Sequence, residues 1–150
     1  MTERETEFRT YDIGIKSWSK MADEILAKYG ERAVVDYPGA KPIKDTPLLT
    51  IGAYTCYAGI AKSEKSGLYL FHFYEDAEDG NAKEKLVSLL GGMPVYGYYG
   101  GLTYSRNRSN ADILADTSMK LLQPKNSALG GFNLIANGSD LFYAAGQFNP

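Results

Sequence analysis

The chain of 150 residues is poor in the two side chains most used in small catalytic and metal sites, with one cysteine, Cys56, and one histidine, His72. A single cysteine cannot form an internal disulfide, which excludes the disulfide frameworks of small secreted domains and favours a reducing compartment. One cysteine and one histidine are also too few for a structural zinc site. We therefore expect a cytoplasmic protein that holds no metal ion.

Long apolar runs and an excess of positive charge are missing as well. No stretch reaches the ~20 apolar residues of a membrane span, and residues 1–9 are charged and lack the apolar core of a signal peptide. The net charge of −2 provides no basic surface for nucleic acid or anionic lipid. Neither glycine-rich phosphate-binding pattern occurs. We expect no nucleic acid, no membrane insertion and no cofactor.

The residues that are present predict one α+β domain. Hydrophobic residues make up 44% of the chain, enough for a single core. Helical spacing of apolar residues predicts about three helices, over 17–29, 81–90 and 109–122. Alternating patterns predict strands over 11–15, 33–37, 48–52, 55–61, 68–73, 94–101, 132–136 and 139–145, with a proline-bearing loop over 38–47 and a hairpin turn at Asn137-Gly138. We expect mixed or antiparallel sheets, sandwich-like and flanked by the helices, over residues 1–150, with 1–10 frayed.

Cys56 and His72 fall on neighbouring predicted strands. Taken singly, a free cysteine usually packs as a small apolar side chain, and a lone histidine is usually structural. Together they are the parts of a thiol nucleophile and its general base. The period of two puts Leu68, Leu70 and His72 on one face of their strand, so a catalytic pair requires Cys56 on that same face.

The spacing of these residues resembles a known family. The run Thr50-Ile-Gly-Ala-Tyr-Thr-Cys56, followed by Gly67-Leu-Tyr-Leu-Phe-His-Phe73, is similar to the core motif of the CheD family of chemoreceptor glutamine deamidases. The family's catalytic Thr, Cys and His match Thr50, Cys56 and His72. The same Cys-His layout is shared by deamidating toxins of the cytotoxic-necrotizing-factor type.

The resemblance implies hydrolysis of a glutamine side-chain amide in a protein substrate through a thioester. Cys56 would attack with its pKa lowered by a neighbouring imidazolium, His72 would move the proton, and Thr50 would orient the imidazole ring. Backbone groups of residues 54–57 would hold the oxyanion, and Gly52 would allow close approach of the chain. These supporting positions are Gly52, Tyr54, Thr55 and Tyr57.

The chain departs from the family pattern in three places. Tyr54-Thr55 replaces the usual Gly-Ser, Tyr74-Glu75 follows His72-Phe73 in place of Leu-Pro, and Phe132-Asn133 stands where a basic residue usually follows the last glycine pair. Two alternatives therefore stay open beside a chemoreceptor deamidase. One is a non-catalytic binding or structural domain of the same fold, and the other is a secreted effector that deamidates a host protein.

Overall fold

The computed structural model describes residues 8–36, 39–53, 56–65, 67–74, 82–101, 119–122 and 131–148. Within these ranges the chain forms two α-helices, one 3-10 helix and nine strands. The helices are α1 (Gly14–Tyr29), η2 (Gly30–Ala33) and α2 (Ala82–Leu90). The strands are β1 (Arg9–Asp12), β2 (Gly39–Pro42), β3 (Leu48–Ala53), β4 (Cys56–Ser63), β5 (Leu68–Tyr74), β6 (Pro94–Gly101), β7 (Met119–Leu121), β8 (Gly131–Asn137) and β9 (Asp140–Gly146).

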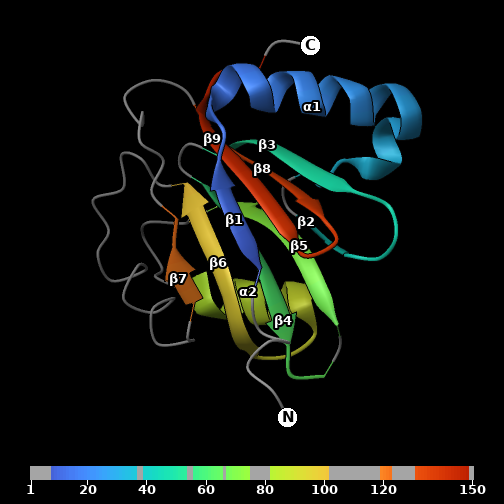
Figure 1. Cartoon of the computed structure of the whole chain (residues 1–150). Helices are drawn as coiled ribbons and strands as arrows, with labels where there is room; N and C mark the ends of the chain where they lie inside the picture. The colour runs from blue at the N-terminus through green and yellow to red at the C-terminus, as the bar shows by residue number, and fades with distance from the viewer. Residues whose placement is uncertain are drawn as a thin grey trace.

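The strands form two mixed sheets, which confirms the α+β class (Figure 1). The order is β1-β9-β8-β3 in the four-stranded sheet and β2-β5-β4-β6-β7 in the five-stranded sheet. The pairs β1–β9 and β6–β7 are parallel, and the other strand pairs are antiparallel. The expected hairpin turn is present between β8 and β9, where Gly138 has a φ of 60°.

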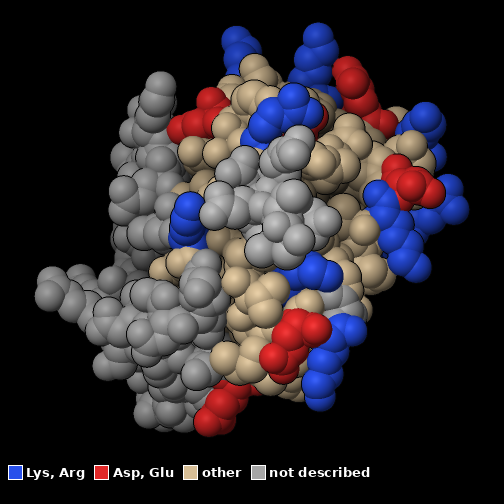
Figure 2. Space-filling view, turned by 60° about the horizontal axis from the view of Figure 1, so that its bottom comes forward, with Lys and Arg blue, Asp and Glu red and all other residues tan. Residues whose placement is uncertain are grey.

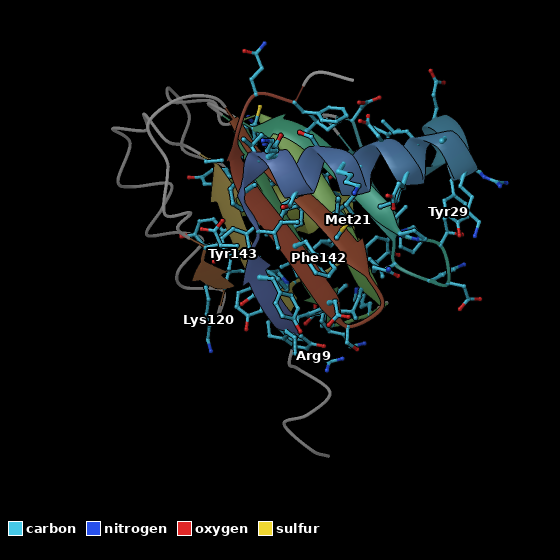
Figure 3. The ribbon with its side chains drawn as sticks, turned by 45° about the horizontal axis from the view of Figure 1, so that its top comes forward. Arg9, Met21, Tyr29, Lys120, Phe142 and Tyr143 are labelled. Carbon is cyan, nitrogen blue, oxygen red and sulfur yellow. The ribbon has the colours of Figure 1, made fainter. Side chains whose placement is uncertain are left out.

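Three groups of buried side chains hold the layers together. Ile60, Leu70 and Leu134 belong to the group that fills the space between the two sheets. Trp18 of α1 packs on the outer face of the four-stranded sheet, across which the helix runs in Figure 3. Leu86 of α2 packs on the outer face of the five-stranded sheet. The layers therefore run α1, four-stranded sheet, five-stranded sheet, α2, each element burying its apolar face against the next.

Neighbouring residues of β9 show the alternation that builds these layers. Phe142 packs with the α1 group, whereas Tyr143 packs with the group between the sheets (Figure 3). Successive side chains of a strand point to opposite faces, so one strand supplies two cores.

The N-terminal part differs from the sequence prediction in its boundaries. The first strand ends at Asp12, and α1 begins at Gly14 rather than at residue 17. The helix ends as expected at Gly30, which adopts a φ of 67°. Phe8 is buried, and Arg9 of β1 pairs with Asp140 of β9. The expected fraying therefore does not extend to residues 8–10. Residues 1–7 lie outside the described part of the chain.

Within residues 33–42, the strand lies in the part that was predicted to be a loop. Of the segment predicted as a strand, the described residues 33–36 begin with the end of η2 and make a single bridge, between Val34 and Leu49. Residues 39–42, predicted as loop, form strand β2 on β5. Pro42 is tolerated because it is the last residue of a strand at a sheet edge, where a missing N–H costs little.

The third predicted helix is wrong at its C-terminal end. Met119–Leu121 forms β7, parallel to β6, and the N–H of Leu122 donates to the carbonyl of Tyr99 at 2.8 Å. Pairing with a neighbouring strand outweighs the local helical spacing there. The rest of this prediction, residues 109–118, lies outside the described residues. No helix in the described ranges is both long enough and apolar enough to span a membrane.

Candidate active site

Three strands from both sheets carry the residues of the candidate site. Thr50 lies in β3, Cys56 is the first residue of β4, and His72 lies near the end of β5. Thr50 and His72 are buried, with 0% and 5% of their surface exposed, and Cys56 is half-buried. The site therefore lies between the sheets, where the strand end that carries Cys56 still reaches solvent.

The register of β4 and β5 places Cys56 on the face that carries His72. Ala58 lies directly opposite His72, and Cys56 lies opposite Tyr74. Opposed residues of antiparallel strands share a face, as do residues two apart in one strand. Cys56 is thus the diagonal neighbour of His72, a relation that typically separates Cα atoms by about 7–8 Å. Cys56 also packs with the apolar group between the sheets.

Thr50 binds the imidazole ring directly. Its Oγ1 lies 2.7 Å from Nδ1 of His72 and 2.6 Å from the carbonyl oxygen of Val35. A hydroxyl has one hydrogen, and the carbonyl of Val35 can only accept, so that hydrogen is donated to Val35. His72 must then donate its Nδ1–H to Thr50. This assignment leaves Nε2 without a hydrogen, in the state that a general base requires.

Val35 supports this arrangement through its backbone alone. Its N–H donates to the carbonyl of Leu49 at 2.8 Å, which holds residues 34–35 alongside β3. Its own carbonyl accepts the Thr50 hydroxyl. The sequence carries no signal for this role because any residue type provides a carbonyl group.

Burial keeps both reactive groups neutral in the resting protein. Desolvation lowers the pKa of His72 to about 4, and the nearby negative charge of Asp36 opposes that shift only in part. Burial raises the pKa of the Cys56 thiol. The expected thiolate–imidazolium pair is therefore wrong for the resting state, because the same burial disfavours both charged forms. The pair is a thiol beside a neutral imidazole.

A β-bulge precedes Cys56. Thr50 pairs with Leu134 and Ala53 with Phe132, so β3 has one more residue than β8 over this interval. Gly52, within the bulge, has a φ of 74°, and a Cβ placed on Gly131 would come within 2.6 Å of the Gly52 Cα. The missing side chain of Gly131 thus allows the two backbones to touch, whereas Gly52, four residues before Cys56, provides the positive φ of the bulge; the close approach expected of Gly52 is provided by Gly131.

Asn133 ties this bulge to the rest of the four-stranded sheet. Its side chain is fully buried, and its Oδ1 accepts the N–H of Gly52 at 2.9 Å. The N–H of Gly52 is therefore used inside the fold. Asn133 was not predicted as a site residue, although one polar residue within the apolar run 132–136 is a detectable signal.

The supporting backbone positions divide into two groups. Tyr54 and Thr55 lie outside the described residues. Tyr57 has strand neighbours on both sides, Phe73 and Gly101, and its side chain packs on the α2 side of the sheet. Backbone N–H groups of a central strand are normally used by the sheet, so Tyr57 is a weak oxyanion donor.

Within the described residues, no three His, Cys, Asp or Glu side chains come together in a way that could hold a metal ion. The chemistry accessible to Thr50, Cys56 and His72 is nucleophilic attack assisted by proton transfer. No protein-family model matches the chain, and a search of curated proteins gives no match.

Proposed function

We propose that the chain is a cysteine-dependent deamidase that hydrolyses the side-chain amide of a protein glutamine to glutamate. The observation that carries the proposal is the bond between Thr50 and Nδ1 of His72, with the hydroxyl proton committed to Val35. With the ring hydrogen on Nδ1, Nε2 of His72 carries no hydrogen, which is the form of the ring that accepts a proton. Cys56, the only thiol, lies on the same face one diagonal step away.

The first half of the reaction forms the thioester. As the Cys56 sulfur attacks the carboxamide carbon, its proton passes to Nε2 of His72, and a tetrahedral oxyanion forms. The same proton then passes to the amide nitrogen. Ammonia leaves, and a thioester joins Cys56 to the side chain of the substrate.

The second half restores the enzyme. Nε2 of His72 takes a proton from a water molecule as that water attacks the thioester carbonyl. The new tetrahedral intermediate expels the Cys56 sulfur, which regains its proton from His72, and glutamate is released. Because the resting pair is neutral, proton transfer accompanies attack in both halves instead of preceding it.

A glutamine-containing peptide library and mass spectrometry provide the direct test. We expect release of ammonia together with conversion of glutamine to glutamate, and no conversion by Cys56→Ala. His72→Gln should lower kcat by on the order of a hundredfold or more, the usual contribution of a general base. Conversion that survives Cys56→Ala would refute the proposed nucleophile.

The substrate class follows from the resemblance to the chemoreceptor deamidases, so chemoreceptor fragments are the first proteins to test. Figure 2 shows basic and acidic side chains intermixed over the described part of one face, which gives that face no bias toward a partner of one charge. We place the protein in the cytoplasm, where its single thiol stays reduced. Deamidation of a host protein but not of receptor fragments would favour the effector alternative.

The neutral resting pair favours one second candidate, a binding domain of the same fold without activity. In that case Cys56 is only a packing residue. Cys56→Ser would then change the free energy of unfolding, whereas no thioester would be trapped by hydroxylamine from any glutamine peptide. A trapped hydroxamate that depends on Cys56 would exclude this alternative.

A further inference from the structure

The side-chain amide of Asn133 forms four hydrogen bonds to backbone groups of the four-stranded sheet. Its Oδ1 accepts the N–H of Gly52 in β3 at 2.9 Å. Its Nδ2 reaches three carbonyl oxygens, those of Gly131 at 3.2 Å, Ala144 at 3.1 Å and Gly146 at 3.0 Å. One buried amide thus connects three strands, β3, β8 and β9.

The orientation of this amide is determined by its partners. Oδ1 faces a donor and Nδ2 faces only acceptors, so a flipped amide would place like groups against each other at every contact. The two hydrogens of Nδ2 are shared among three carbonyls. Because the side chain is fully buried, no water can replace these bonds if they are lost.

The bond to Gly52 holds the bulge in β3. Gly131 packs against the backbone of Gly52 so closely that no side chain fits between them. The bulge lets Thr50 lie opposite Leu134 while Ala53 lies opposite Phe132. Without the extra residue one of these two pairings would shift by one residue, and a shift on the Thr50 side would turn its side chain away from the space between the sheets. The Asn133–Gly52 bond thus holds the backbone two residues after Thr50, at the bulge that makes both pairings possible.

We propose that Asn133 is a positioning residue of this site, which acts through the Gly52 backbone to hold Thr50 against the imidazole of His72. For catalysis, this inference rests on the proposed function. The expected effect of Asn133 on the tautomer of His72 does not rest on the proposed function, because the Thr50–His72 bond exists with or without turnover. The chain has one histidine, so every imidazole signal in a spectrum reports on that bond.

The test compares wild type, Asn133→Ala and a control, Asn137→Ala, at the exposed end of the same strand. Imidazole nitrogen chemical shifts report the tautomer of His72 and its titration. We expect wild type and the control to show the Nδ1–H tautomer and a pKa of about 4. In Asn133→Ala we expect a mixture of tautomers and a kcat on a glutamine peptide lowered by about tenfold.

A folded Asn133→Ala variant with the wild-type tautomer would overturn the inference, since Asn133 would then only support the fold. If that variant does not fold, the inference is tested on the wild-type protein in mild denaturant. We expect the backbone amide hydrogen of Gly52 to exchange with solvent in the same local opening that removes the Nδ1–H tautomer of His72. His72 keeping that state after Gly52 exchanges would equally overturn it. Absence of peptide hydrolysis by wild type refutes the proposed function and leaves the His72 result intact.

Discussion

His72 is oriented by a hydroxyl, where many related catalytic arrangements use a carboxylate. Thr50 Oγ1 accepts the Nδ1–H but carries no full charge, so it fixes the tautomer without strongly favouring an imidazolium. Burial between the sheets then dominates the electrostatics of the ring. The consequence is an imidazole that stays neutral over the whole physiological pH range.

The lowered pKa of His72 makes the stability of the protein depend on pH. The unfolded chain binds a proton near pH 6.5, whereas the folded protein resists protonation until about pH 4. The free energy of unfolding should therefore be highest above pH 6.5, fall as the pH drops toward 4, and lose roughly 3 kcal/mol in total from this group.

Urea unfolding between pH 5 and 7 isolates this effect, because His72 is the only histidine and other side chains titrate little in that window. The matched variant His72→Gln should show a nearly flat profile over the same range. A flat profile in wild type would mean that the ring is exposed or already charged in the folded protein.

Substitutions at Thr50 distinguish the contribution of its hydroxyl group from that of its side-chain packing. Thr50→Val keeps the shape of the side chain but leaves the Val35 carbonyl and the His72 Nδ1 without their partner, at a cost of about 2 kcal/mol. Thr50→Ser keeps the hydroxyl, so we expect it to retain the Nδ1–H tautomer and most of the activity. Chemical denaturation and imidazole nitrogen spectra measure both effects. Equal behaviour of the two variants would contradict the assigned role of the hydroxyl.

At the scale of the elements, the bulge in β3 joins the sheet to the site. Gly52 and Gly131 make a backbone-to-backbone contact there, and β3 resumes its pairing at Ala53. A bulge bends its strand and increases the local twist. β3 ends at Ala53, directly after the bulge, and β4 of the other sheet begins at Cys56. This segment thus connects Thr50 in one sheet with Cys56 in the other.

Gly52→Ala tests the conformational requirement of the bulge. The added Cβ would meet no atom within 4 Å, so its cost comes from the φ of 74° alone, roughly 1–2 kcal/mol. We expect that loss of stability by chemical denaturation, together with a lowered kcat.

Gly67→Ala is the matched control, because Gly67 is exposed and its added Cβ also meets no atom within 4 Å. Its free energy of unfolding should stay within about 0.5 kcal/mol of wild type. If both alanine variants matched wild type, the left-handed backbone of Gly52 would not constrain this strand.

At the scale of the whole molecule, the site lies where two sheets face each other in a four-layer fold. β4 is the central strand of its sheet, paired with β5 on one side and β6 on the other. His72 and Thr50 sit inside the apolar layer that joins the sheets. The apolar layer between the sheets therefore also holds the histidine of the candidate site.

Amide hydrogen exchange should show that the central strand β4 is more protected than the edge strand β1. Residues 58–60 of β4 have neighbours on both sides, so we expect them to exchange only through global unfolding. Residues 9–12 form an edge strand paired only with β9, and we expect them to exchange at least about a hundredfold faster. Native-state exchange monitored by NMR makes the comparison, and equal protection of the two strands would contradict it.

The sequence was sufficient where the pattern is local. Alternation in 68–73 correctly divided Leu70 from Phe71 between two cores. Asn137-Gly138 correctly indicated a hairpin, although its turn residues are Gly138 and Ser139, one position later than predicted. The motif spacing identified Thr50, and the structure places its hydroxyl at bonding distance from His72. These features depend on side-chain period and on turn chemistry, which are properties of a few consecutive residues.

The remaining features depend on partners far away in the chain. β2 and β7 exist because β5 and β6 offer them free edges, which outweighs the local proline and the helical spacing. The Val35 carbonyl, the Asn133 amide and the neutral state of Cys56 and His72 follow from burial between layers. By itself the sequence determined which residues could react. Only the tertiary structure decided their protonation and orientation, because desolvation and hydrogen-bond partners exist only once the sheets have packed.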